Sequence, residues 1–210
     1  SAPNILKAPG TSVSAASKAT VKYKYKGKTK TFKGVSRKVL YNSKTVSLKK
    51  TPIIVMSGYH MAPYKETFVK GSLKAKKAYT SKTRTLILTA NGHTVKLKAE
   101  SKTAYVDGKK KKLPIAPKMI TYCSSKLTRF MVPLKETASF LGLTYTWNKK
   151  TGTIQLKHYT EPSNANNNAS SAASTENTSG TEEVDSNTSS IEMPDANEEE
   201  IAAFHYTMSL

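Results

Sequence analysis

The chain has 210 residues, and its charge is divided unevenly along its length. Residues 1–157 carry all 34 lysines and arginines with only four acidic residues, for a formal charge of +30, whereas residues 158–210 carry ten acidic residues and no lysine or arginine. This length allows one domain with a sizeable core or two small ones; the single cysteine, Cys123, excludes an intrachain disulfide and a cysteine-based zinc site, and no apolar run reaches the roughly 20 residues of a membrane span.

The N-terminal part of the chain predicts a leader followed by a strand pair. Residues 1–20 are rich in Ser and Ala and contain Pro and Gly, so we predict a mobile leader. In residues 21–32, apolar residues alternate with lysines that include Lys22 and Lys24. This period of two predicts a half-buried strand, a turn near Gly27 and a return strand.

The same alternation returns in residues 94–98. Val95 and Leu97 oppose Lys96 and Lys98, which predicts another strand with one apolar and one lysine face. The solvent face of a sheet therefore accounts for much of the positive charge, although it does not explain why acidic residues are so scarce beside it.

A turn signal, Asp107-Gly108, precedes four consecutive lysines. Successive side chains of a strand point to opposite faces, so a central strand of this composition would bury charge. We therefore expect the strand that contains this run to lie at a sheet edge, where lysines also discourage pairing with other chains. The four residues are Lys109, Lys110, Lys111 and Lys112.

A short helix is predicted after residue 132. Pro133 suits the first turn of a helix, where its missing N–H costs nothing. Leu134, Ala138 and Leu141 then follow at i, i+4 and i+7 and form one apolar stripe. Gly142 supplies a left-handed exit.

A final hairpin is predicted from the alternation in residues 143–147, the turn at 148–152 and the strand at 154–156. Trp147 is interpreted as a core residue. A stacking platform for glycan rings, made with Tyr79 and Tyr59, is the alternative if the sheet curls so that these three side chains are exposed.

The C-terminal part changes in composition. Residues 159–200 are acidic, rich in Ser, Asn and Thr and low in apolar residues, so we predict a disordered linker. Residues 201–210 are apolar and alternating, which suggests the first strand of a further domain. Alternatively, the acidic segment folds back on the basic body through charge, a contact that salt would weaken.

Two stretches of the chain match each other in order. Met61-x-Pro63-x-Lys65-Glu66-Thr67 matches Met131-x-Pro133-x-Lys135-Glu136-Thr137, and further matches lie upstream and downstream. The pattern predicts an internal duplication: a first repeat within residues 21–100 and a second within residues 101–158, each read as hairpin, loop, short helix and hairpin. The sequence leaves open whether the repeats form one sheet or two lobes.

The second repeat, with MVPLKETASFLGLTYTWNKKTGTIQL at its centre, resembles the copper amine oxidase N-terminal domain-like family, also called stalk domains, of exported proteins from Gram-positive bacteria. The resemblance covers a little over half of the chain, and the first repeat is divergent. It implies an α+β fold with two tandem copies of a twisted antiparallel sheet packed on a short α-helix. It also implies a module without a catalytic role of its own, often linked to cell-wall amidases.

The sequence offers little support for a reaction centre. His60, His93, His158 and His205 are scattered, so we expect no copper or other metal site, and we expect no cofactor. Glu66 and Glu136 could form a carboxylate pair, but each is better interpreted as a first-turn helix residue with lysine partners. Cys123 has no histidine nearby in the sequence and is interpreted as a loop thiol. We therefore predict that the chain is not an enzyme.

The excess of lysine over arginine indicates the class of ligand. With 31 lysines and three arginines, the chain suits a diffuse anionic polymer better than sequence-specific DNA, whose guanines are most often read by arginine. The candidate anion-binding residues are Lys109, Lys110, Lys111, Lys112, Lys96, Lys98, Lys22 and Lys24.

The function expected from these features is a non-catalytic structural module, extracellular or at the cell wall, that contacts peptidoglycan or an anionic wall polymer and presents a further domain. A basic nucleic-acid-binding protein and an accessory domain of a cell-wall hydrolase are the alternatives. The sequence leaves the oligomeric state open.

Overall fold

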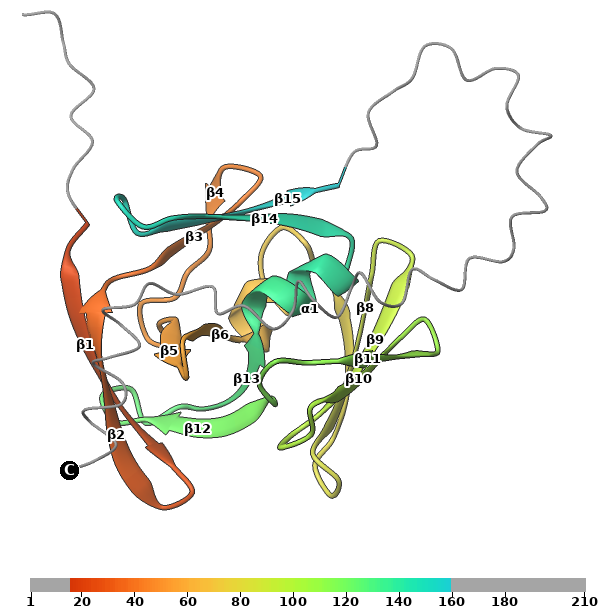
Figure 1. Ribbon diagram of the computed structural model, residues 1–210, viewed down its shortest axis with the longest axis horizontal. Coiled ribbons are helices and arrows are strands. Elements are labelled where there is room, and N and C mark those ends of the chain that lie inside the picture. The colour runs from red at the N-terminus through yellow and green to blue at the C-terminus, as the bar shows by residue number, and fades with distance from the viewer. Residues whose placement is uncertain (1–15, 160–210) are drawn as a thin grey trace, which may run out of the picture.

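The fold was obtained as a computed structural model, which describes residues 16–159 as mostly β-structure with few helices (Figure 1). This composition is compatible with the predicted α+β class. The strands are β1 (Lys18–Tyr25), β2 (Lys28–Val35), β3 (Lys38–Tyr41), β4 (Lys44–Thr45), β5 (Ile54–Met56), β6 (Tyr59–Pro63), β7 (Lys76–Thr80), β8 (Thr85–Ala90), β9 (His93–Lys98), β10 (Thr103–Val106), β11 (Lys109–Lys112), β12 (Lys118–Tyr122), β13 (Thr128–Pro133), β14 (Leu143–Asn148) and β15 (Thr153–His158). The helices are α1 (Leu134–Phe140) and a single π-helical turn, η1 (Lys65–Val69).

A six-stranded sheet, in the order β2-β1-β12-β13-β6-β5, joins the two stretches that match in sequence. β13 and β6 are antiparallel neighbours in its middle, with Val132 opposite Ala62. On either side of that pair, Met131 lies opposite Pro63 and Pro133 opposite Met61. The matching residues are therefore related by a local two-fold arrangement about the Ala62–Val132 pair.

A five-stranded sheet, in the order β11-β10-β9-β8-β7, lies on the right of Figure 1. β9 shows the alternation that the sequence predicted: Val95 and Leu97 are fully buried, while Lys96 and Lys98 are exposed. β11, the strand of four lysines, is at the edge, as expected. Its edge position leaves the inward-pointing Lys111 half-buried rather than enclosed.

A four-stranded sheet, in the order β14-β15-β3-β4, lies at the top of Figure 1. Its central pair, β15 and β3, is parallel, with Ile154 opposite Val39. The expectation of antiparallel pairing throughout is wrong at this point. The physical reason is that β3 and β15 come from distant parts of the chain and are not the arms of one hairpin, so no tight turn imposes an antiparallel direction on them.

The helix α1 lies at the centre of the molecule, in contact with β14, β6, β13 and β9 (Figure 1). Its predicted apolar stripe, Leu134, Ala138 and Leu141, is fully buried. Pro133 is the residue immediately before the helix, and Gly142 has a φ of +79°, the predicted left-handed exit. The matching first-stretch helix, η1, is only a single turn, and Lys70 stands where the second stretch has the apolar Phe140.

One large hydrophobic core is shared by the three sheets and α1. Among its fully buried members are Ala62 and Val132 from the six-stranded sheet and Leu86 and Val95 from the five-stranded sheet. A smaller cluster that includes Tyr23 and Tyr122 lies in the part of the six-stranded sheet formed by β1, β12 and their neighbours. All three sheets therefore depend on the same buried centre.

The segments expected from the sequence, residues 21–100 and 101–158, are interleaved in space. β12 pairs with β1, β10 with β9 and β15 with β3, so every sheet contains strands from both segments. β1 begins at Lys18, inside the predicted leader, because its ladder to β2 extends to Val35. The rest of the leader up to residue 15, the predicted linker and the predicted strand at residues 201–210 lie outside the described residues, apart from Tyr159.

Candidate functional site: a cationic groove on the five-stranded sheet

The outer face of the five-stranded sheet forms a groove of about 570 Å³. Its cationic side chains come from strands β9 and β11, and its hydroxyl groups come from β7, β8, β10 and the turns beside them. We call it the lysine–tyrosine groove. Its lining residues are Thr80, Thr83, Thr85, Ile87, Lys96, Leu97, Lys98, Ser101, Thr103, Tyr105 and Lys110.

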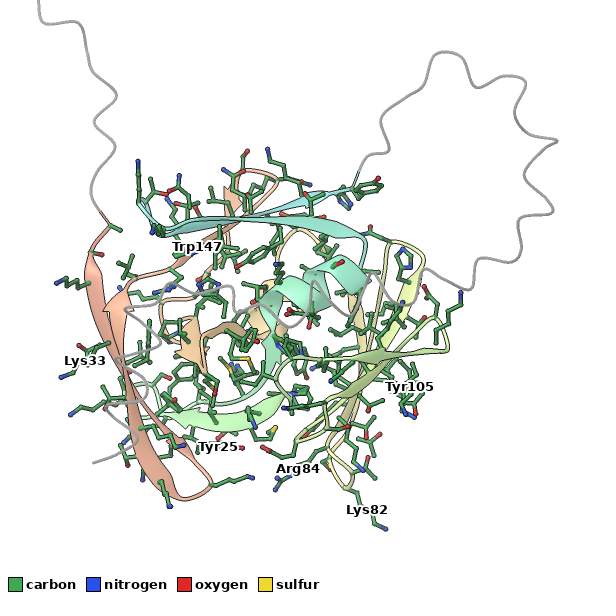
Figure 2. The ribbon with its side chains drawn as sticks, viewed as in Figure 1. Tyr25, Lys33, Lys82, Arg84, Tyr105 and Trp147 are labelled. Atoms are coloured by element: carbon green, nitrogen blue, oxygen red, sulfur yellow. The ribbon has the colours of Figure 1, made fainter. Side chains whose placement is uncertain are left out.

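Strand register brings the cations of the groove around one aromatic ring. Tyr105 on β10 lies opposite Lys96 of β9 on one side and opposite Lys110 of β11 on the other. It is exposed, at 44% of its full accessible area. Figure 2 shows Tyr105 on the outer side of the sheet, away from α1.

The groove is built on a rigid base. Beneath its lysines, Val95, Leu97, Leu86 and Leu88 are fully buried and fix the strand faces. Lysine side chains on a strand whose other face is buried must point into solvent. Among residues 16–159, the lining contains three ammonium groups and no carboxylate, so the electrostatic potential of these residues favours an anion.

Asp107, in the turn between β10 and β11 that the sequence predicted, joins this turn to β9. Asp107 Oδ2 lies 2.7 Å from His93 Nδ1, and its Oδ1 accepts a hydrogen bond from the backbone N–H of Thr94 at 2.8 Å. These two hydrogen bonds hold the pKa of the Asp107 carboxyl below its usual range. Asp107 and Gly108 both have positive φ, as a two-residue hairpin turn requires.

The structure brings some of the predicted anion-binding lysines together and separates others. Lys96, Lys98 and Lys110 line the groove. Lys112 lies opposite Thr103, a lining residue, whereas Lys109 and Lys111 alternate to the other side of β11. Lys22 and Lys24 are exposed on β1 and belong to the six-stranded sheet, so they form a separate basic surface.

The three candidate stacking residues lie in three different sheets. Trp147, on β14, is half-buried, and the guanidinium carbon of Arg37 is 4.8 Å from its ring centroid. Tyr79, on β7, is 37% exposed and packs edge-on against Phe130. Tyr59, on β6, is half-buried against the smaller core cluster. The exposed aromatic ring among the lysines is instead Tyr105, which sequence reasoning missed.

A buried polar network that the sequence did not reveal joins the six-stranded and four-stranded sheets. Arg37 Nε donates to Nε2 of the fully buried His60 at 3.0 Å. An arginine is always protonated, so this His60 nitrogen accepts and the other, Nδ1, donates to the Tyr145 hydroxyl at 2.7 Å in the neutral imidazole. The edge of the His60 ring also packs on Trp147, with centroids 4.7 Å apart. The network therefore orients the β14 aromatic residues toward the interior.

Glu66 lies in the first turn of η1, as interpreted, but its partner is an arginine and not a lysine. Both oxygens of this 9% exposed carboxylate accept hydrogen bonds from Nε of Arg129, at 2.5 and 3.1 Å, and not from a lysine. Arginine suits this buried position because its guanidinium is always charged and is more weakly hydrated than an ammonium group. The matching residue, Glu136, is also buried, in the first turn of α1.

A second polar cluster surrounds Glu100. Its carboxylate accepts a hydrogen bond from Tyr25 at 2.7 Å and lies 3.2 and 3.4 Å from the ammonium groups of Lys118 and Lys26. Burial raises the pKa of Glu100, but the hydrogen bonds from Tyr25 and Lys118 and the lysine charges outweigh it, so the pKa lies below 4.5.

The Glu100→Gln variant should be less stable at pH 7 by roughly 1 kcal/mol, since exposed pairs contribute at most about that much each. A depressed folded-state pKa stabilises the folded chain above the unfolded pKa, and this contribution is lost as the pH falls through the folded pKa. The difference between variant and parent should therefore disappear at acidic pH. Urea unfolding followed by Trp147 fluorescence at both pH values would measure it; a constant difference would contradict the argument.

Residues 16–159 contain neither a cluster of metal ligands nor a membrane-spanning helix. No three His, Cys, Asp or Glu side chains in this range gather where they could hold a metal ion. Within the same range, no helix has the length and apolar character needed to cross a membrane. Cys123 is a half-buried free thiol.

Residues 61–122 match the family model of the copper amine oxidase N-terminal domain. The matched range runs from β6 to β12 and contains the whole five-stranded sheet, but it ends before the residues 131–156 on which the resemblance was mainly drawn. The N-terminal domain in question is a non-catalytic module. No curated protein and no solved structure matches the chain.

Proposed function

We infer, with this non-catalytic domain as the starting point, that the chain is a structural module of an exported bacterial protein and binds anionic cell-wall polymers through the lysine–tyrosine groove. The observation that carries the proposal is the placement of the exposed Tyr105 between Lys96 and Lys110 in a groove without carboxylates. Localisation at the cell wall and a Gram-positive source are parts of the same proposal.

Each part of the groove has a chemical task in this proposal. The ammonium groups of Lys96, Lys98 and Lys110 attract the phosphates or carboxylates of the polymer, each contact contributing a fraction of a kcal/mol that salt screens. The Tyr105 ring offers an apolar face to a sugar or polyol unit between two charges. The threonine and serine hydroxyls at the groove can donate to or accept from polymer hydroxyls.

The internal duplication is a further part of the proposal. It is supported by the order of elements, since a hairpin, a second hairpin, a helix and a third hairpin follow one another in residues 38–90 and again in residues 103–158. The two-fold pairing about Ala62 and Val132 also supports it. In this view the duplication built a scaffold for one binding face, and a further domain, such as an amidase, would be presented by it.

The groove is tested by co-sedimentation of the full chain with purified cell walls, with and without their anionic polymers, at low and high salt. Replacing Lys96 and Lys110 together by glutamine should weaken binding to polymer-bearing walls roughly tenfold, the effect of losing two exposed charge contacts. Adding the Tyr105→Ala change to this double variant should weaken the binding to the walls further. The same double change at Lys22 and Lys24 removes equal charge from another sheet and is the matched control.

The expected pattern is specific to the groove. Binding should require the anionic polymer, decline with salt, and respond to the groove variants much more than to the control. Equal pelleting in every condition would remove the electrostatic account. Equal weakening by the two double variants would show that the positive charge acts diffusely and that the groove is not the site.

Single-stranded nucleic acid is the second candidate, because the same observation favours it: an exposed aromatic ring flanked by lysines can also stack a base beside a bound phosphate. A competition experiment distinguishes the wall polymer from single-stranded nucleic acid as the ligand. An excess of single-stranded DNA or RNA should leave wall binding largely unchanged at physiological salt if the polymer is the ligand. Nanomolar binding of the nucleic acid under these conditions would reverse the order of the two.

A further inference from the structure

A second cavity, of about 580 Å³, lies between the loop after β4, the loop after η1 and the beginning of β13. It shares no lining residue with the lysine–tyrosine groove. Exposed lysines stand at its rim, and we call it the arginine cavity after its half-buried cation. Its charged lining residues are Lys44, Lys49, Lys50, Lys70, Arg129 and Glu66.

The guanidinium of Arg129 is positioned for a ligand. Its Nε is held by Glu66, and its Nη1 donates to the Thr128 carbonyl at 3.0 Å. Within residues 16–159, its third nitrogen, Nη2, has no hydrogen-bond partner. The Arg129 side chain is only 15% exposed, its guanidinium is held in direction by Glu66 and the Thr128 carbonyl, and Arg129 is a lining residue of the cavity.

The buried hydroxyl of Thr67, another lining residue, also lacks a hydrogen-bond partner among the described residues. It would not mark a site by itself, because the matching hydroxyl of Thr137 is equally without a partner and does not line this cavity. The Arg129 guanidinium is distinguished by its low exposure, by its fixed position between Glu66 and the Thr128 carbonyl, and by its place in the cavity lining. Arg129 and the charge around it therefore indicate a ligand.

The charge of the cavity indicates the class of ligand. Its five cations face one carboxylate, and that carboxylate is already paired with Arg129. A phosphate group, with a charge of about −1.5 to −2 and three acceptor oxygens, matches one guanidinium N–H and several ammonium groups better than a single carboxylate does. The volume lies within the usual 300–1,000 Å³ of small-molecule sites.

We propose that the arginine cavity binds a phosphate ester, with its phosphate between Arg129 Nη2 and the ammonium groups of Lys44 and Lys70. The body of the ligand would lie against the apolar wall formed by Val46, Leu73 and Leu127. This site is separate from the groove, and it does not depend on wall binding through Tyr105. A free small phosphate ester and a phosphate unit of a polymer share this chemistry.

The presence of only three arginines makes the test direct, because the Nε–Hε region of a nitrogen-15 correlation spectrum of the full chain contains only the signals of Arg37, Arg84 and Arg129. The chain is titrated at constant ionic strength with sn-glycerol 3-phosphate, with inorganic phosphate and, separately, with a poly(glycerol phosphate). The Arg129 signal should move and saturate with at least one of these probes while the Arg84 signal stays in place. Saturation by sn-glycerol 3-phosphate or by the poly(glycerol phosphate) identifies a free ester or a polymer as the source, whereas saturation by inorganic phosphate alone would contradict a phosphate ester as the ligand.

Replacing Lys44 and Lys70 together by glutamine should raise the half-saturation concentration roughly tenfold. The matched double change at Lys22 and Lys24 should leave it unchanged. These variants keep the Arg129–Glu66 pair, so a loss of folding does not confuse the result. A shift of the Arg129 signal that does not saturate with any probe would overturn the site, and so would equal effects of the two double variants. Either result would mean that the added ions only screen the charges of the protein in a general way.

Discussion

Replacing Gly152 by alanine should lower the free energy of unfolding by about 3 kcal/mol. Gly152 has a φ of +70°, a left-handed conformation that costs other residues about 1–2 kcal/mol. A Cβ there would also stand 2.4 Å from the Ser36 carbonyl oxygen and 3.0 Å from Val35 Cγ1. The contact with a backbone oxygen cannot be relieved by a change of rotamer, so the β14–β15 turn must move away from the segment before β3. The Lys38 N–H donates a hydrogen bond to the Gly152 carbonyl between these two segments, and this movement would strain it.

Gly27 is the matched control, because its φ is +77° and a Cβ added to it would meet nothing within 4 Å. The Gly27→Ala variant should lose only about 1 kcal/mol, the cost of the backbone conformation alone. Equilibrium urea unfolding followed by Trp147 fluorescence measures both losses. Similar losses in the two variants would show that the turn does not pack closely on Ser36.

Replacing Glu66 by alanine should cost about 3 kcal/mol, because it leaves the guanidinium of Arg129 largely buried without its counter-charge. The pair also joins η1 to β13, two elements far apart in the sequence. The Glu100→Ala variant, which removes a more exposed carboxylate, is the control and should cost about 1 kcal/mol.

A double-mutant cycle separates the ion pair from other effects of the change at Glu66. The Arg129→Leu variant should also be destabilised, and the double variant should be more stable than the sum of the two losses predicts, because neither charge is then left buried alone. Unfolding by urea, compared across the four chains, gives the coupling energy. Strict additivity would mean that the two side chains do not stabilise each other.

Features set by neighbouring residues were predictable from the sequence. The alternation of Val95 with Lys96 needs only the period of a strand, and the helix stripe ending at Gly142 needs only the period of a helix and a left-handed exit. The Asp107-Gly108 turn also predicts the register of the strands that it joins. A two-residue turn centred there places Tyr105 opposite Lys110, which would have identified the aromatic ring of the groove.

Features set by distant residues were not predictable in this way. The periodicity of β3 and β15 is the same whether they pair with each other or with other strands, so the parallel Val39–Ile154 pair leaves no local signal. The pairing of Glu66 with Arg129 likewise depends on strand order. Arg129 is one of three arginines in a lysine-rich chain, which favours a fixed, buried ion pair at this position but does not identify the partner.

The parallel pairing of β3 with β15 has a kinetic consequence. The hydrogen bond between Tyr41 and His158 joins residues 117 positions apart. β3 therefore cannot pair with β15 until the long segment between the two strands has been brought into place. Closing so long a loop costs entropy before any contact compensates for it. Chains dominated by such distant contacts fold in milliseconds to seconds, not microseconds. During this delay the edge of β3 is open to other chains, and the mutual repulsion of so many lysines would then keep half-formed molecules apart.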